Sequence, residues 1–287
     1  MSKVLILGAK GNLGIQLVKV FGENHEVIAW DRDDIDVTDK EAVTKKIVDA
    51  KPDVIINSTG YNAVDKCEED ENEYAIAKKL NGDAVGYLAD ASMEIGATLI
   101  VFASDYVFSG DKKEGYAEDD ETSPQSKYAQ TKVMGEKEII SRSDKGLEWY
   151  LIRTSKLFGP KGESEGSKES FFDLILRLSA ERKEFKMVDG EEISCFTYTV
   201  DLARAIKKLV EENYAFGIYH LVNSGPASWY AGAKFLFELK NITDVNLIPS
   251  KSSDYPRPAK RPMFSVLLNT KFEQLRDWKE ALREYLK

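Results

Sequence analysis

The chain has few cysteines and histidines for its length. Its 287 residues include only Cys67 and Cys195, and only His25 and His220. Two cysteines are too few for a disulfide framework or a cysteine-based metal site. Two histidines argue against a histidine-rich metal centre or a histidine-based catalytic triad. We therefore expect no metal site, and we expect a reducing cytoplasm as the location.

Long apolar runs and an excess of positive charge are also missing. Runs such as Val4–Leu7 fall far short of the roughly 20 residues that a membrane helix needs. Met1–Val4 leads directly into a strand pattern, so we expect no signal peptide. The 49 acidic residues outnumber the 40 basic ones, giving a net charge of −9. This balance argues against nucleic acid and anionic membranes as partners.

The hydrophobic content of 43% is sufficient for the core of a large α/β domain, with or without a smaller companion. Short apolar runs alternate with helical patterns, which predicts a doubly wound parallel sheet of the Rossmann type. The predicted strands are Lys3–Leu7, Glu26–Asp31, Asp53–Asn57, Thr98–Ala103, Glu148–Arg153 and Ile218–Val222. The predicted helices are Leu13–Phe21, Lys40–Asp49, Glu73–Ser92, Tyr128–Ser141 and Val200–Glu212, with Thr38 and Thr199 as N-caps of two of them.

The alternation of strands and helices ends after Arg153. The Gly-, Ser- and Glu-rich stretch Lys161–Lys168 is typical of a mobile loop, and Ser250–Pro262 contains three prolines among basic residues. We predict a dinucleotide-binding domain formed by residues 1–154 and about 191–222. A smaller, interleaved C-terminal substrate region would consist of about 155–190 and 223–287.

A glycine-rich segment follows the first predicted strand directly. Its spacing is G-x-x-G-x-x-G, and an amphipathic helix comes next. Glycines allow a tight turn and close backbone approach, and the helix N-terminus faces a pyrophosphate. An ordinary glycine-rich turn is the alternative. We predict an NADPH or NADH site that includes Gly8, Lys10, Gly11, Asn12, Leu13 and Gly14.

The choice between NADH and NADPH stays open. Asp31 ends the second strand, where an acid accepts from the adenosine ribose and favours NAD. Arg32 beside it could meet a 2′-phosphate instead, or could be an ordinary solvated charge. Asp36 and Val37 could flank the adenine. The ends of other strands supply the remaining predicted cofactor contacts, Asn57, Ser58, Thr59, Gly60 and Arg153, although Asn57 and Gly60 could simply form a turn.

A tyrosine followed four residues later by a lysine occurs three times, as Tyr74/Lys78, Tyr128/Lys132 and Tyr230/Lys234. Only Tyr128 opens a predicted helix shortly after a strand that ends in a hydroxyl residue, Ser104. The spacing of four places Tyr128 and Lys132 on one helix face. Context therefore selects this pair, with surface helix residues as the alternative.

These three side chains are suited to reducing a ketone. A phenol has a pKa near 10, and we expect the nearby ammonium to lower the pKa of Tyr128 and make it a usable general acid. Ser104 would donate to the same carbonyl oxygen as charge develops there. A nicotinamide would supply the hydride. The predicted catalytic residues are Ser104, Tyr128 and Lys132.

Motifs along nearly the whole chain support this interpretation. They are Pro52–Asn57, Tyr61–Glu68, Ser104–Gly110, Tyr116–Glu118, Tyr128–Lys132, Gly135–Glu136, Arg153–Ser155, Gly217–Leu221, Ser228–Tyr230, Arg261–Ser265 and Asp277–Leu282. In this order they resemble the extended short-chain dehydrogenases/reductases, and within them the dTDP-4-dehydrorhamnose reductases. Two segments depart from the family pattern: Lys156 stands where the family usually has Trp, and Glu191–Phe196 differs from its usual motif.

The resemblance implies reduction of the 4-keto group of dTDP-4-dehydro-L-rhamnose with NADPH or NADH. It implies that Lys132 also holds the nicotinamide ribose. Candidates near the nucleotide sugar are Asp105, Tyr106, Arg257 and Arg261, because a guanidinium can bind a diphosphate with two parallel hydrogen bonds. Solvated charges on a proline-rich loop are the alternative for the two arginines.

Two other functions remain open at this point. A non-catalytic relative would bind NADP and regulate a partner enzyme such as methionine adenosyltransferase. An epimerase or dehydratase on the same fold would need further acid–base groups beside the tyrosine. The partner that we expect is a nucleotide-sugar substrate, and the sequence leaves a homodimer open.

Overall fold

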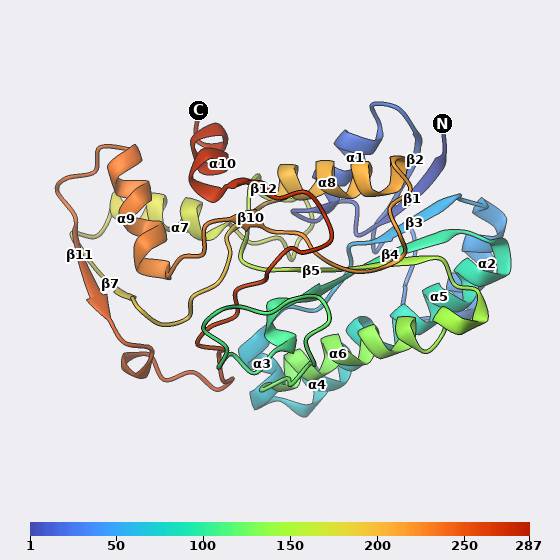
Figure 1. Ribbon diagram of the computed structural model, residues 1–287, viewed down its shortest axis with the longest axis horizontal. Coiled ribbons are helices and arrows are strands. Elements are labelled where there is room, and N and C mark those ends of the chain that lie inside the picture. The colour runs from blue at the N-terminus through green and yellow to red at the C-terminus, as the bar shows by residue number, and fades with distance from the viewer.

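The computed structural model describes residues 1–287 and is built around a six-stranded parallel sheet. The strand order is β2-β1-β3-β4-β5-β9 (Figure 1). The strands are β1 (Lys3–Leu7), β2 (Glu26–Trp30), β3 (Val54–Asn57), β4 (Thr98–Ser104), β5 (Trp149–Thr154) and β9 (Gly217–His220). All six predicted strands are present, and the predicted parallel sheet is confirmed.

Helices cover both faces of this sheet (Figure 1). One face carries α1 (Gly14–Phe21) and α8 (Thr199–Glu211), and the other carries α2 (Lys40–Ala50), α5 (Ala84–Ile95) and α6 (Lys127–Ile140). Two separate clusters of buried side chains result, one with Leu17 and Leu209 and the other with Val43 and Leu88. Because both faces are buried, strands such as β3 read as continuous apolar runs. None of the helices is both long and apolar enough to span a membrane.

The helix predicted over Glu73–Ser92 is interrupted. After α3 (Val64–Glu69) the chain forms α4 (Glu71–Lys78), one π-helical turn (Lys79–Asp83) and then α5. In that turn the buried Asn81 side chain accepts from Tyr61 N at 2.9 Å and donates to Thr131 Oγ1 at 2.9 Å. Such turns insert one extra residue, often at functional sites. Here the inserted turn is tied directly to α6.

The two predicted threonine N-caps are wrong. Asp39 caps α2 by accepting from Glu41 N and Ala42 N, while the Thr38 hydroxyl donates to Asp36. Helix α8 begins at Thr199 itself, with no side-chain cap before it. A carboxylate satisfies the first N–H groups of a helix as well as a hydroxyl does, so the true cap was one residue away.

A second set of smaller elements follows β5. It comprises β6 (Leu157–Phe158), α7 (Phe171–Ser179), β7 (Glu184–Val188), β8 (Thr197–Tyr198), β10 (Asn223–Ser224), α9 (Trp229–Leu239), β11 (Asn246–Ser250), β12 (Leu275–Asp277) and α10 (Trp278–Tyr285). Its strands pair as β7–β11, β6–β8 and β10–β12, and single 3₁₀ turns lie at Asp105–Val107, Ser143–Lys145 and Ser252–Asp254.

This second set has an aromatic core of its own. Phe158, Phe172, Phe196 and Trp278 are all essentially buried and contact one another. Figure 1 shows α7, α9, β7 and β11 together, away from the large sheet. We keep the division into two parts as a proposal. The C-terminal segment 223–287 does not belong to the smaller part alone, because Phe272 packs into the core of the large sheet.

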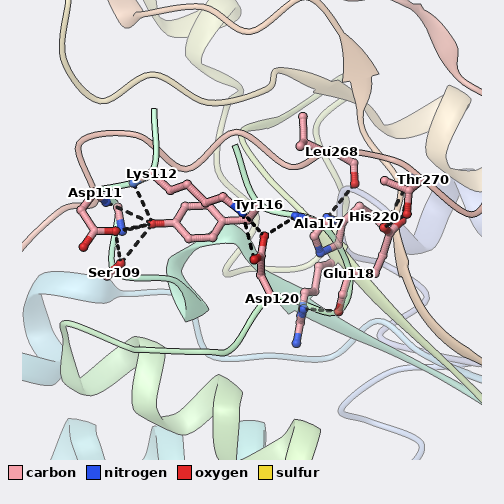
Figure 2. A network of polar contacts seen from close by, with 12 residues as sticks. Ser109, Asp111, Lys112, Tyr116, Ala117, Glu118, Asp120, His220, Leu268 and Thr270 are labelled. Atoms are coloured by element: carbon pink, nitrogen blue, oxygen red, sulfur yellow. Dashed lines mark hydrogen bonds and ion pairs between the residues drawn. The ribbon is translucent and has the colours of Figure 1, made fainter. Parts of the chain in front are cut away.

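A buried polar network joins the segment after β4 to the C-terminal segment (Figure 2). The Tyr116 hydroxyl accepts from Gly110 N and Asp111 N, both at 3.0 Å. Glu118 accepts from Thr270 Oγ1 at 2.6 Å and from His220 N at 3.3 Å. The network fixes the chain that leads from Ser104 and Tyr106 against the end of β9.

In this network burial favours a neutral His220, and hydrogen bonds favour an ionised Glu118. Burial lowers the pKa of His220 to about 4, although the Glu118 charge opposes this. Burial also acts to raise the pKa of Glu118, but the Thr270 hydrogen bond and the His220 charge outweigh it and hold the pKa below its ordinary value. The stabilisation from Glu118 is therefore present above its ordinary pKa and is lost as pH falls through the lowered value.

We expect Glu118→Gln to lower the free energy of unfolding at pH 7 by about 1–3 kcal/mol, because an amide cannot satisfy all these buried donors. Urea unfolding followed by circular dichroism measures the change. The matched control is Glu121→Gln, since Glu121 lies exposed in the same segment. Equal stability of the two variants at pH 7 would show that the network adds nothing.

Candidate active site

Three predicted catalytic side chains come together at the carboxyl end of β4. Ser104 is the last residue of β4, while Tyr128 and Lys132 lie in the first two turns of α6. Lys132 Nζ donates to Phe102 O at 3.4 Å and lies close to Gly60, where an added Cβ would be 3.2 Å from Nζ. The site thus joins β4, α6 and the loop after β3.

The other two tyrosine–lysine pairs lie elsewhere. Tyr74 and Lys78 are on α4, where the Tyr74 hydroxyl donates to Gln130 Oε1 at 3.3 Å. Tyr230 and Lys234 are on α9 in the smaller set of elements. Of the three tyrosines, Tyr128 is the one that faces the Ser104 side chain, so the geometry favours Tyr128 and Lys132.

The expected lowering of the tyrosine pKa is wrong for this structure. Burial raises the pKa of Tyr128 above its ordinary value, and the Ser104 side chain that faces it only partly offsets this. Burial lowers the pKa of Lys132 to about 8, against the charge of Glu136. The sequence spacing gave the helix face correctly, but it contained no information on how deeply both groups are buried. A protonated phenol is nevertheless the form that donates a proton in a reduction.

The glycine segment forms a close-packed loop between β1 and α1. Gly8 has a φ of +74°, and an added Cβ there would lie 3.0 Å from Thr59 N. An added Cβ at Gly14 would overlap Gly8 O. Ser58 Oγ donates to Leu7 O at 2.6 Å, so the ends of β1 and β3 meet here. Because β1 lies between β2 and β3, this is the switch point where such sheets bind nucleotides. The residues fit a dinucleotide.

The predicted adenosine contacts surround the same loop. Asp31 Oδ2 accepts from Lys10 N at 2.9 Å, and Lys10 Nζ pairs with Asp33 at 3.2 Å. Arg32 is exposed and has no ion pair. Asp36 accepts from Thr38, and Val37 is buried. Both a ribose acceptor and free positive charge are therefore present, and the structure leaves the choice between NADH and NADPH open as the sequence did.

The turn after β3 is held by its own side chains. Asn57 Oδ1 accepts from Thr59 Oγ1 at 2.6 Å and from Thr59 N at 3.2 Å. This turn sets Gly60 beside Lys132. Asn57, Ser58, Thr59 and Gly60 thus lie between the glycine loop and the catalytic group, where a bound dinucleotide would pass.

The stretch predicted as a mobile loop is anchored on the glycine segment. Glu163 N and Ser164 N both donate to Lys10 O, at 2.7 and 3.0 Å. Asn12 Oδ1 accepts from Gly162 N at 3.0 Å, and Asn12 Nδ2 donates to Lys168 O at 2.9 Å. Asn12 therefore spans both ends of this loop.

We expect Asn12→Ala to open the 161–168 loop. Two hydrogen bonds of about 0.5–1.5 kcal/mol each would be lost, and this loss corresponds to a roughly 5- to 150-fold rise in the open fraction. Trypsin cleavage after Lys161 and Lys168 measures it. Asn246→Ala, on the exposed edge of β11, should leave this cleavage unchanged. An unchanged rate in Asn12→Ala would mean that other contacts hold the loop.

Arg153, a predicted cofactor contact, is engaged by other side chains inside the protein. Its guanidinium is buried and forms a two-point ion pair with Glu136, at 2.9 and 2.8 Å, with both side chains 3% exposed. It also lies over the Phe108 ring. A strand-end position suggested a ligand contact, but the charge is fully used inside the protein.

The four predicted substrate residues divide into two groups. The Tyr106 and Tyr128 rings meet edge-on, with their centres 6.0 Å apart. The guanidinium carbon of Arg261 lies 6.0 Å from the centre of the Tyr106 ring. Arg261 pairs with Asp65 at 2.7 Å, and Arg257 pairs with Glu192. A diphosphate would compete with these carboxylates. Asp105 is only 3% exposed and accepts from Ser104 and Ser265, so it lies behind the site rather than on its surface.

The segments that depart from the family pattern meet beside the catalytic group. Lys156 Nζ lies 4.2 Å from the centre of the Trp229 ring and donates to Glu192 O at 2.8 Å. Trp229 Nε1 donates to Glu192 Oε2 at 3.1 Å. Lys156 and Glu192 both have positive φ, +39° and +53°. The sequence indicated both segments, Glu191–Phe196 as a departure from the family pattern and Ser228–Tyr230 as a motif of the resemblance, but neither Glu192 nor Trp229 was named as a site residue.

The comparisons with known proteins agree over the whole chain. The family model described as RmlD substrate binding domain matches residues 2–287. The spore coat polysaccharide biosynthesis protein SpsK of Bacillus subtilis is 34% identical over 100% of this chain and 97% of its own.

Two solved structures are similar in sequence and in fold. The crystal structure of a dTDP-4-dehydrorhamnose reductase from Clostridium acetobutylicum is 39% identical, with a TM-score of 0.89 over 99% of this chain and 98% of that chain. The Bacillus anthracis dTDP-4-dehydrorhamnose reductase in complex with NADP is 30% identical, with a TM-score of 0.90 over the same shares. The family match, the sequence identity and the shared fold together show that this chain belongs to the dTDP-4-dehydrorhamnose reductase family of oxidoreductases.

Proposed function

We propose that this protein reduces the 4-keto group of a nucleotide-linked deoxysugar to an alcohol, using NADPH or NADH. The substrate that we propose is dTDP-4-dehydro-L-rhamnose, which would give dTDP-L-rhamnose. The observation that carries the proposal is the placement of Tyr128, Ser104 and Lys132 at one strand end beside the glycine loop.

The side chains divide the acid chemistry between them. The Tyr128 hydroxyl, kept protonated by its raised pKa, donates its proton to the reacting oxygen. Lys132, a cation below about pH 8, stabilises the phenolate that is left. Ser104 donates a hydrogen bond to the same oxygen. A bound nicotinamide would supply the hydride.

The residues around the glycine loop would hold the dinucleotide. Gly8, Gly11 and Gly14 leave room for the pyrophosphate at the start of α1, and Asp31 and Arg32 would meet the adenosine ribose. Lys132 would meet the nicotinamide ribose from beside Gly60. The Bacillus anthracis relative was solved with NADP, which supports the same class of cofactor here.

The sugar end of the site is where this protein differs from the family pattern. Lys156, Trp229 and Glu192 would face the sugar from the smaller set of elements, while Tyr106 and Arg261 would lie towards the nucleotide. The test is oxidation of NADPH and NADH with a panel of nucleotide-linked 4-keto sugars. Turnover with a 4-keto deoxysugar supports the proposal, whereas a stoichiometric protein partner without turnover would favour the regulatory alternative.

A further inference from the structure

Asp105 is a buried carboxyl held on both oxygens by hydroxyl groups. It follows Ser104 directly and is only 3% exposed. Ser104 Oγ donates to Asp105 Oδ1 at 3.0 Å, and Ser265 Oγ donates to Oδ2 at 2.6 Å. Because its side chain is buried, Asp105 can influence a substrate only through a neighbour, and the neighbour in the catalytic group is Ser104.

Ser104 has one hydrogen to donate, and Asp105 takes it in this structure. The Ser104 oxygen also accepts from Tyr106 N at 3.2 Å, which fixes the side chain. In the proposed reduction the same hydrogen is needed at the reacting oxygen, where negative charge develops. An ionised Asp105 therefore competes with the substrate for the Ser104 hydrogen.

We propose that Asp105 is a positioning residue whose protonated form turns the Ser104 hydrogen towards the reacting oxygen, an inference that rests on the reductase function proposed above. A proton on Oδ1 reverses the hydrogen bond, so that the carboxyl donates to Ser104 Oγ. Ser265 directs the proton to Oδ1, because it already donates to Oδ2. The Ser104 hydroxyl is then free to face Tyr128 and the substrate.

The surroundings of Asp105 make both forms accessible near neutral pH. Burial raises the pKa of Asp105 to about 6, against the Ser265 and Ser104 hydrogen bonds and the charge of Lys156. Three further titratable groups face it and are neutral at pH 7, since burial raises the pKa of each: Tyr106, Tyr128 and Cys195. Lys156 is thus the charged side chain that most affects its ionisation.

The test is the dependence of kcat on pH at saturating sugar and cofactor. In the wild-type protein we expect kcat to fall at least about tenfold between pH 6 and pH 8 as Asp105 ionises. Asp105→Asn should remove this fall, because its amide NH₂ donates to Ser104 and its oxygen accepts from Ser265, as in the protonated acid. The matched control Asp119→Asn changes an exposed carboxyl of the following loop and should keep the wild-type profile.

Two results would overturn the proposal. One is a folded Asp105→Asn protein that keeps the fall in kcat between pH 6 and 8. The other is a folded Asp105→Asn protein whose kcat at pH 6 is lower than that of the wild type by more than about tenfold, because the amide was expected to replace the protonated acid. Circular dichroism establishes that each variant is folded.

A second measurement does not depend on turnover. The carbonyl stretch of protonated Asp105 should appear in the infrared difference spectrum between pH 5 and pH 8 and be absent in Asp105→Asn. Lys156→Met should move this titration to higher pH, because the cation that favours ionisation is removed. No band, or no shift in Lys156→Met, would contradict the inference. Absence of turnover with every sugar would instead contradict the proposed function while this titration still stands.

Discussion

Tyr128→Phe is expected to bind NADPH normally and to lose at least about 10²-fold in kcat, the range that a general acid contributes. Only the phenol oxygen is removed, and the ring keeps its packing against Tyr106 and Cys67. Ser104 cannot replace the lost proton donor, because an aliphatic hydroxyl is much less acidic than a phenol. Steady-state oxidation of NADPH measures kcat, and a fluorescence titration measures the affinity for NADPH.

The other two tyrosine–lysine pairs supply matched controls for this prediction. Tyr74→Phe and Tyr230→Phe remove the same atom from the same sequence pattern on α4 and α9. We expect kcat within about twofold of wild type for both, since surface changes have small effects. If Tyr128→Phe also kept near-normal turnover, the assignment of Tyr128 as the proton donor would be wrong.

Gly14→Ala is expected to weaken NADPH binding by roughly 5- to 150-fold, which corresponds to the about 1–3 kcal/mol that overpacking typically costs. The added methyl group would overlap Gly8 O and lie 2.9 Å from Ala9 C. Both contacts are backbone, so the glycine loop must move away from the start of α1. That movement takes the loop N–H groups out of position for a pyrophosphate.

The control for this prediction is Gly166→Ala, because an added Cβ there meets nothing within 4 Å. Gly166 lies in the 161–168 loop, which is hydrogen-bonded to the glycine segment. The control therefore shows whether an added methyl group in that loop weakens NADPH binding without overlapping Gly8. The dissociation constant for NADPH from fluorescence titration is the measurement. Equal affinity in both variants would contradict the account of the glycine loop.

The large sheet could be predicted from the sequence because its signals are local. Each of its strands is a short apolar run, and Gly8 and Gly14 follow the first of them at the spacing that a nucleotide loop needs. The smaller set of elements escaped prediction, since β6, β8 and β10 are only two residues long and their pairing partners are distant in sequence. Their structure depends on burial against residues that are distant in the sequence, and hydrophobic periodicity does not reveal such contacts.

The same distinction applies at the candidate site. Spacing and order along the chain select Ser104, Tyr128 and Lys132, and the structure places all three at the end of β4; their catalytic role stays a prediction. The ion pairs Arg153–Glu136 and Arg257–Glu192 join residues that are far apart in the sequence or lie on different elements, so no local motif indicates them. The ionisation of Tyr128 and Asp105 depends on burial, which a motif cannot give.

The most direct test of the central claim is a coupled assay of sugar and cofactor. The purified protein is given NADPH or NADH with dTDP-4-dehydro-L-rhamnose, and both the oxidised nicotinamide and the sugar product are quantified. The account predicts one nicotinamide oxidised for each 4-keto group converted to a 4-hydroxyl group, with turnover lost in Tyr128→Phe. A protein that binds NADPH but oxidises it with no nucleotide-linked 4-keto sugar would contradict the account.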